Sequence, residues 1–455
     1  MPISSINPYN SEVLEEFIEF KDHQIEQALH NGQKAFRAWS KTSFSHKREL
    51  MHKCADVLEQ NIEKLSQIIT LEMGKIISES RAEINKCAWV CRYYADHAET
   101  FLKDEKLDLE EADSYLVYDP LGIVLAIMPW NFPFWQVFRF AAPGLMSGNV
   151  GILKHASNVP QCALAIEEVF LEAGFPEGAF QTLLIGSGKV PKIIDDSRIV
   201  AVTLTGSDMA GRKVAERAGK NLKKLVLELG GSDPFIVLKE ADIKTAVDTA
   251  VKARMINCGQ SCIAAKRFIL EERIFDEFID LFDKAFNAMK GGDPLLDQVD
   301  YGPMAREDLV AEIDHQVEAS VNLGAKILTG GGRPGVKGSF YQPAILTNVK
   351  PGMPAFDEEL FGPVASVITA RDASDAVNIA NNSRFGLGAS LWTQDRDKAW
   401  ELARKIETGA VFVNAMVASH PKVPFGGIKD SGYGRELSYL GIREFMNAKS
   451  IWVSG

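Results

Sequence analysis

Apolar runs of strand length alternate with helical segments through the middle of this 455-residue chain. The segments at 162–174 and 211–219 repeat their apolar residues with the spacing of amphipathic helices. The strand candidates around them lie at 150–155, 180–186, 201–206, 224–230 and 234–238. Such alternation is typical of βαβ units, in which helices cover a sheet of parallel strands. The sequence therefore predicts an α/β protein.

The flanking segments extend this pattern in both directions. Residues 23–104 carry apolar positions at helical spacing, and 114–128 are predicted to be strands broken at Asp119-Pro120. In the second half an amphipathic helix is predicted over 273–291, with further strands at 267–272, 325–330 and 364–370. No linker or internal repeat marks a boundary, so the pattern alone predicts two α/β units that join near Gly230-Gly231.

The composition narrows the classes of partner. A formal net charge of -11, from 50 basic and 61 acidic residues, argues against nucleic acid and favours a soluble cytosolic protein. The N-terminus has no secretory signal pattern, and no apolar run approaches the ~18 residues of a membrane helix. Six cysteines without a CxxC pair, and the lack of HExxH, predict free thiols and no metal site. We therefore expect a cytoplasmic protein without membrane or metal partners.

A cysteine in the segment NCGQSCIAAKR could be a nucleophile. Lys266 and Arg267 follow Cys262 closely, and nearby positive charge lowers the pKa of a thiol toward the reactive thiolate. A buried structural thiol explains the same residues equally well. Cys258 lies four residues earlier in the chain, and spacing alone does not choose between the two cysteines.

Other residues are also open to two interpretations. Glu228 ends an apolar strand before two glycines, where it could be a general base or only a surface cap. The turns at 186–191 and 205–211 could meet a phosphate through backbone N–H groups, but neither has the full GxGxxG pattern. The segment PWNFPFW at 129–135 holds Asn131 in a stiff apolar setting. The Asn131 amide could donate to an oxyanion, or the segment could be a rigid core turn.

Together these segments resemble the aldehyde dehydrogenase superfamily. The resemblance runs from LEMGK at 71–75 to the C-terminal segment. Its motifs stand in the family's order: PWNFP, LK at 153–154, TGS at 205–207, ELGG at 228–231, GQSC at 259–262, EELFGPV at 358–364 and PFGGIKDSGYGRE at 424–436. Seven motifs in order make a chance match improbable, although each motif alone is weak.

The resemblance implies roles for the ambiguous residues. It makes Cys262 the nucleophile, with Cys258 an accessory thiol, and Glu228 the general base. It makes Asn131 the oxyanion donor, together with the backbone N–H of Cys262. The thiolate would attack the aldehyde carbon, hydride would leave to the nicotinamide, and Glu228 would activate the water that releases the acid from a thioester. CoA-acylating relatives lack this glutamate, so its presence favours hydrolysis over transfer to CoA.

The same resemblance implies a set of cofactor contacts: the adenosine ribose at Lys154 and Ser157, the pyrophosphate at Gly206 and Ser207, the nicotinamide ribose at Glu359, and the nicotinamide cleft at Trp130 and Phe361. Members that prefer NAD usually carry an acidic residue in place of Ser157, which would repel a 2′-phosphate. Serine removes that repulsion and Lys154 adds a cation. We therefore expect NADP to be preferred, although serine does not exclude NAD.

Two further residues match substrate contacts of succinic semialdehyde dehydrogenases. Arg139 lies eight residues after Asn131, and Ser419 lies five residues before the PFGG motif. An arginine in an apolar tunnel needs an anion, which a substrate carboxylate would supply; a salt bridge to a nearby acid is the alternative. Longer relatives often carry a second arginine where this chain has Ile256. The lack of that arginine would make the substrate tunnel of this chain less selective.

The expected reaction is therefore the oxidation of succinic semialdehyde to succinate. The alternatives are a broad-specificity aliphatic aldehyde dehydrogenase, a thiol esterase without redox function, and a non-catalytic protein on the same fold. The resemblance implies an aldehyde dehydrogenase-like fold with a Rossmann-type cofactor domain at 1–107 and 121–229 and a related α/β catalytic domain at 230–430. A small β bridging segment at 108–120 and 431–455 would join subunits, and either a homodimer or a homotetramer fits.

Overall fold

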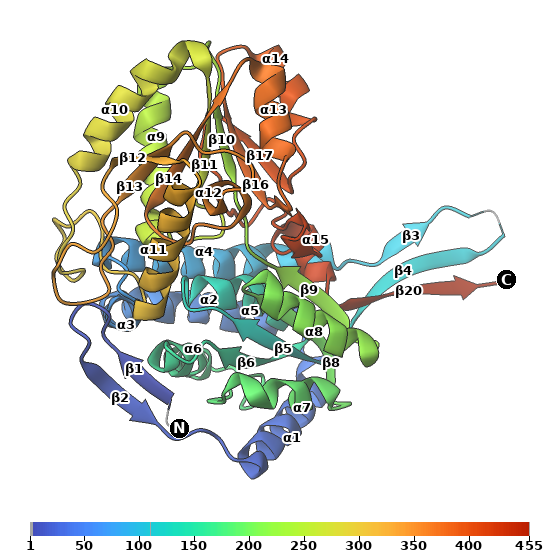
Figure 1. Cartoon of the computed structure of the whole chain (residues 1–455). Helices are drawn as coiled ribbons and strands as arrows, with labels where there is room; N and C mark the ends of the chain where they lie inside the picture. Colours follow the sequence, from blue (N-terminus) through green and yellow to red (C-terminus); the bar gives the residue numbers. More distant parts are fainter. Residues whose placement is uncertain (1–2, 110, 455) are drawn as a thin grey trace.

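The computed structural model describes residues 3–109 and 111–454 of the chain. Two sheets with their covering helices make up the body, and a three-stranded sheet projects from it as an arm (Figure 1). None of the described helices is both long and apolar enough to cross a lipid bilayer.

The first sheet, drawn in the lower half of Figure 1, has the strand order β19-β9-β8-β5-β6-β7. Its strands are β5 (Ile123–Met128), β6 (Val150–His155), β7 (Phe180–Thr182), β8 (Ile199–Thr205), β9 (Lys224–Glu228) and β19 (Gly432–Tyr433). Strands β5 to β9 are parallel, whereas β19 is antiparallel to β9. Strands β5, β6 and β8 are buried almost throughout, as expected for a parallel sheet covered on both faces. The predicted parallel sheet is confirmed, although the strand expected over 180–186 ends at Thr182.

Helices follow each of the central strands and complete the predicted βαβ units. These crossover helices are α5 (Trp135–Met146), α6 (Pro160–Glu172), α7 (Val190–Asp195) and α8 (Asp208–Lys220). The segment predicted as helical, 23–104, folds into α1 (Asp22–Trp39), α2 (Phe44–Gln60), α3 (Ile62–Met73) and α4 (Ile77–Phe101). Helix α4 packs against α2 and α5, which places it beside the segment that follows β5. A hairpin of β1 (Ile3–Ile6) and β2 (Val13–Phe17) precedes these helices.

The second sheet has the order β12-β13-β14-β11-β10-β16-β17 and is parallel except for the β12–β13 pair. Its strands are β10 (Pro234–Val237), β11 (Arg267–Glu271), β12 (Lys326–Thr329), β13 (Ala344–Thr347), β14 (Val364–Ala370), β16 (Gly388–Trp392) and β17 (Ala410–Val413). The helices of this half are α9 (Ile243–Met255), α10 (Phe275–Asn287), α11 (Glu307–Asn322), α12 (Pro354–Asp357), α13 (Ala373–Asn381) and α14 (Arg396–Ala403). The short strands β15 (Phe385–Gly386) and β18 (Ile428–Lys429) pair with each other, and α15 (Ser438–Arg443) packs against α4 and α5.

The arm consists of β3 (Glu105–Leu107), β4 (Asp113–Pro120) and β20 (Met446–Val453), all antiparallel. The C-terminal strand β20 pairs with β4 along its whole length, so two segments far apart in the sequence lie side by side in the arm (Figure 1). The hairpin starts earlier than the expected residue 108, because β3 begins at Glu105. Strand β19, which falls in the segment 431–455, belongs to the first sheet. The residue boundaries expected for the domains stay a prediction.

Candidate active site

Cys262 lies where two cavities meet. The larger cavity has a volume of about 670 Å³ and the smaller about 170 Å³. Cys262 and Gln136 line both cavities. The carboxyl ends of strands from the first sheet border the larger cavity, whereas α4 and α5 border the smaller one. A group bound in one cavity can therefore meet a group bound in the other at this sulfur.

The backbone before Cys262 forms an unusual turn that the GQSC motif makes possible. Asn257, Cys258 and Gly259 have φ values of 52°, 53° and 75°, all in the left-handed region. A Cβ atom on Gly259 would collide with the carbonyl oxygen of Gly362, so the turn needs glycine here. Arg254, which is fully buried, donates from Nη2 to the Gly259 carbonyl at 2.6 Å and fixes the turn.

The thiol of Cys262 is not activated by its basic neighbours in the way the sequence suggested. Burial raises the pKa of Cys262 to about 12, and the charges of Lys266 and Arg139 offset this only in part. The Lys266 ammonium donates to the carbonyls of residues 261 and 262, both at 2.7 Å, and makes no hydrogen bond to the sulfur. Arg267 points to the Ser232 carbonyl at 2.9 Å. The expected lowering of the thiol pKa is therefore wrong for this state, because desolvation outweighs the nearby charge.

The structure separates the two cysteines that spacing left open. Cys258 is 5% exposed and is not among the residues that line either cavity. Burial raises the pKa of Cys258 to about 12 as well. Cys262 is the more exposed of the pair and reaches both cavities. Access to a substrate therefore favours Cys262 as the nucleophile.

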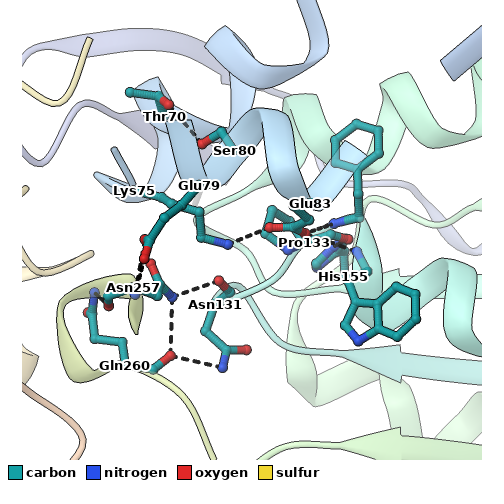
Figure 2. Close-up of polar contacts among 12 residues, drawn as sticks. Thr70, Lys75, Glu79, Ser80, Glu83, Asn131, Pro133, His155, Asn257 and Gln260 are labelled. Carbon is teal, nitrogen blue, oxygen red and sulfur yellow. Dashed lines mark hydrogen bonds and ion pairs between the residues drawn. The ribbon is translucent and has the colours of Figure 1, made fainter. Parts of the chain in front are cut away.

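The side chain of Asn131 lies against the turn that carries Cys262 (Figure 2). Its Nδ2 donates to the carbonyl of Gln260 at 3.1 Å. Asn257 bridges the two segments, because its Nδ2 donates to the Asn131 carbonyl at 2.8 Å and to the Gln260 carbonyl at 3.1 Å. An amide nitrogen carries two hydrogens, so Asn131 keeps one for a further acceptor. That geometry suits a donor to an oxygen bound beside Cys262.

A buried carboxylate on α4 fixes the segment that follows Asn131 (Figure 2). Glu83 accepts hydrogen bonds from the backbone N–H groups of Phe134 at 2.8 Å and Trp135 at 2.9 Å, where α5 begins. Its other oxygen forms a buried ion pair with Lys75. The Lys75 ammonium also lies 3.8 Å from the centre of the Phe132 ring. Helix α4 and the loop that precedes it thus hold the PWNFPFW segment in place.

His155 fixes the same segment from the side of the sheet. Its Nδ1 accepts from the Ala156 N–H at 2.9 Å, so Nε2 carries the proton and donates to the Pro133 carbonyl at 2.9 Å. Burial lowers the pKa of His155 to about 4, and the ring is therefore neutral near pH 7. The histidine is a structural hydrogen-bond donor at this position.

Glu228 ends β9 and is 2% exposed. Burial raises the pKa of Glu228 well above its ordinary value; Glu436 raises it further, and Arg139 opposes the shift. Neither Glu228 oxygen finds a hydrogen-bond partner among the described residues. The carboxylate lies beside Gly426 and does not line either cavity in this structure. Its role as general base stays a prediction.

Arg139 and Ser419 both line the smaller cavity. The Arg139 guanidinium forms a buried ion pair with Glu436, donates to the Thr205 hydroxyl at 3.3 Å and packs 4.6 Å from the Phe425 ring centre. The salt bridge considered as the alternative is therefore present, although Arg139 also reaches the cavity. The Ser419 hydroxyl accepts a hydrogen bond from the ammonium of Lys86 at 2.8 Å.

The residues expected to bind pyrophosphate lie at the carboxyl end of β8. Ser207 caps α8, its hydroxyl accepting from the Ala210 N–H at 3.3 Å. Gly206 and Ser207 line the larger cavity, where the first turn of α8 presents N–H groups suited to an anion. Lys154 is the penultimate residue of β6, and the exposed Ser157 lies two residues beyond the end of that strand. These two do not line the cavity, because β6 lies beyond β5 and is two strands from β8 in the sheet.

Glu359 and Phe361 close the larger cavity from the second half of the molecule. Glu359 accepts from the Gly231 N–H at 3.0 Å and lies 3.2 Å from the Lys266 ammonium. The Phe361 ring packs edge-on against Trp130, with centroids 5.8 Å apart. Five of the expected cofactor residues therefore line one cavity: Trp130, Gly206, Ser207, Glu359 and Phe361. Lys154 and Ser157 do not line it.

Sequence reasoning missed several residues of the site. Gln136 lines both cavities, and Glu436 pairs with Arg139. On α4, residues at 79, 82, 83 and 86 line the smaller cavity and include Glu83 and Lys86. A signal for these residues was available in the sequence. The charged residues at 79, 83 and 86 have the spacing i, i+4 and i+7, which places them on one helix face that is otherwise largely apolar.

Comparisons with known proteins agree with this geometry. The model of the aldehyde dehydrogenase family matches residues 1–451. The chain is 51% identical over 454 residues to a protein from Synechocystis sp. named a probable succinate-semialdehyde dehydrogenase for NADP(+), covering 100% of both. It is 48% identical over 457 residues to a succinate-semialdehyde dehydrogenase for NADP(+) from Mycobacterium bovis, again covering 100% of both.

A solved structure extends the comparison to the fold. Succinic semialdehyde dehydrogenase from Streptococcus pyogenes, in complex with NADP+, is 37% identical to the chain with a TM-score of 0.98. The match covers 99% of this chain and 100% of that one. The expected aldehyde dehydrogenase-like fold is confirmed. With a family model and close relatives that span its length, the chain belongs to the aldehyde dehydrogenase family.

Proposed function

We propose that this chain is an NADP-preferring succinic semialdehyde dehydrogenase that forms succinate through a thioester on Cys262. The observation that carries the proposal is the position of Cys262 between two different cavities. One is lined by the N-terminus of α8 and by most of the expected dinucleotide residues. The other is lined by the basic side chains Lys86 and Arg139, together with two glutamates of α4. The names of the relatives support the same substrate and cofactor.

The residues around the larger cavity fit a dinucleotide. Gly206, Ser207 and the first turn of α8 suit its pyrophosphate, and Glu359 suits a ribose. Lys154 supplies a cation and Ser157 a hydroxyl at the place proposed for the 2′-phosphate, and no acidic side chain stands at either position. NADP, when bound there with Trp130 and Phe361 beside its nicotinamide, supplies the hydride acceptor.

The protein's own residues then perform three tasks. Cys262 forms the bond to the aldehyde carbon. The side-chain amide of Asn131 and the backbone N–H of Cys262 donate hydrogen bonds to the oxyanion and stabilise it. Asn257 holds Asn131 in position by donating to its backbone carbonyl. Glu228 takes a proton from the water that releases the acid; the raised pKa of this carboxyl makes it a stronger base than an ordinary glutamate.

We also propose that the arm joins subunits into a homodimer or homotetramer in the cytoplasm. Strand β20 leaves Ile451, Trp452 and Val453 between 40% and 56% exposed. Exposed apolar residues on a projecting sheet favour contact with a second copy of the chain. The cysteines are free thiols, which suits a reducing compartment.

One assay tests the substrate and the cofactor together. Formation of reduced nicotinamide is followed by absorbance with succinic semialdehyde or butanal, each with NADP and with NAD. The proposal expects the highest kcat/KM with succinic semialdehyde and NADP. Equal kcat/KM for the two aldehydes would favour the broad-specificity alternative, and ester hydrolysis without aldehyde oxidation would favour an esterase.

A further inference from the structure

The smaller cavity contains a basic group that the expected site did not include. Lys86 lies on α4, one helical turn from Glu83 and two from Glu79, and all three line the cavity. Cys262 lies in the wall of the same cavity, together with the apolar residues Phe132, Trp135, Ile256, Ile263 and Phe425. The cavity is therefore a largely apolar space that holds a nucleophile, the cations Lys86 and Arg139, and the carboxylates Glu83 and Glu79, the last of which accepts from the Asn257 N–H.

Lys86 has no acidic partner within the described part of the chain. Its ammonium donates to the Ser419 hydroxyl at 2.8 Å and lies 4.3 Å from the Trp135 ring centre, but it forms no ion pair there. The nearby Glu83 is committed to Lys75 and to two backbone N–H groups. A desolvated cation without a counter-ion is costly, and an anionic ligand would relieve that cost.

The electrostatic environment of Lys86 agrees with this view. The pKa of Lys86 is lowered to about 8, mainly by burial. The charges of Arg139 and Lys75 also lower this pKa, whereas Cys87 and Glu83 raise it. A carboxylate bound at the ammonium would favour the charged form. Arg139 is in the opposite position, because Glu436 already balances its charge.

We propose that Lys86, with the hydroxyl of Ser419, binds the substrate carboxylate and makes the enzyme selective for aldehydes that carry a terminal carboxylate. This inference rests on the proposed function and deepens it. Arg139 then acts chiefly with Glu436 in the wall of the cavity and contributes less to selectivity. The cavity volume of about 170 Å³ suits a short acyl chain between the ammonium and Cys262.

The kinetic test compares Lys86→Met with Asn85→Met. Asn85 is the preceding residue on α4 but is exposed, so it is a matched control for the helix. Lys86→Met should raise KM for succinic semialdehyde at least about tenfold, since a charge-assisted pair is lost. KM for butanal and kcat should change little, and Asn85→Met should behave as wild type. Lys86→Arg should restore most of the selectivity, and Lys86→Gln replaces Met if that variant does not fold.

A binding test avoids turnover altogether. Succinate should slow the alkylation of Cys262 by iodoacetamide in the wild type, because it occupies the smaller cavity. The same concentration should give little protection in Lys86→Met, whereas Asn85→Met should be protected. Equal protection in all three proteins, or equal KM changes for both aldehydes, would overturn the role of Lys86. A wild type that does not prefer succinic semialdehyde to butanal would instead count against the proposed function.

Discussion

The guanidinium of Arg139 and the carboxylate of Glu436 form an ion pair inside the protein, with side chains only 2% and 5% exposed. The pair joins α5 to the segment between β19 and α15, two regions far apart in the chain. Both charges act on Glu228: Glu436 raises the pKa of Glu228, and Arg139 lowers it. The ion pair therefore modifies the electrostatic environment of the proposed general base, in which burial raises the pKa most.

Neutralising Glu436 should shift the pH dependence of the reaction. Glu228 acts as a base only when ionised, so its contribution is lost as pH falls through its raised pKa. Glu436→Gln removes a like charge, which lowers the pKa of Glu228 and moves the acidic limb of the kcat profile to lower pH by roughly one unit. Arg139→Met should move that limb to higher pH. The pH profile is measured with the hydrolysis of an ester substrate. If the acidic limbs of both variants coincide with that of the wild type, the coupling is excluded.

The buried thiol leads to a second pH prediction. The pKa of Cys262 is raised to about 12, so the reactive thiolate is scarce near neutral pH in the protein without bound ligands. Alkylation of Cys262 by iodoacetamide should therefore accelerate with pH, by about tenfold per unit, across the whole range from about pH 7 to pH 10. Mass spectrometry locates the label. Cys258→Ala should behave as wild type, and a rate that levels off near pH 7 would show that the thiolate already exists there.

The core of the fold could be predicted from local sequence. Strands β5, β6 and β8 are continuous apolar runs, and α10 repeats buried phenylalanines at 278, 282 and 286 with helical spacing. Strands β13, β16 and β17 were missed, and their length is not the reason, because the predicted strands β10 and β12 are no longer than these. The start of β3 at Glu105 was missed because its polar residues look like the end of the preceding helix.

The residues of the candidate site could also be predicted only in part from the sequence. Cys262, Glu228 and Asn131 could be named because each lies in a short motif. The partnership of Arg139 with Glu436 could not, because only the folded chain brings those segments together. The thiol pKa was predicted in the wrong direction for the same reason: charge near Cys262 is visible in sequence, whereas burial is not.

Removing the charge of Glu83 should affect both stability and catalysis. Glu83→Gln breaks the buried pair with Lys75 and weakens the acceptor for the N–H groups of Phe134 and Trp135. Breaking such a pair costs about 3–5 kcal/mol of the free energy of unfolding. Because that network holds the segment of Asn131, kcat should fall as well. Glu99→Gln, which loses an exposed pair with Arg48, is the matched control and should change neither. Unfolding is followed by urea titration, and an unchanged midpoint for Glu83→Gln would contradict the prediction.

Introducing an acid at position 157 should change the cofactor preference. Ser157 is exposed two residues beyond the end of β6 and three residues after Lys154, so a glutamate there would not have to be buried. Ser157→Glu should lower kcat/KM with NADP by at least about tenfold, because its carboxylate repels the 2′-phosphate and pairs with Lys154. Activity with NAD should be retained, since the 2′-hydroxyl can donate to the new acid. Ser157→Ala removes the hydroxyl without adding charge and should have a smaller effect on NADP. If Ser157→Glu leaves the ratio of the two kcat/KM values unchanged, the adenosine ribose binds elsewhere.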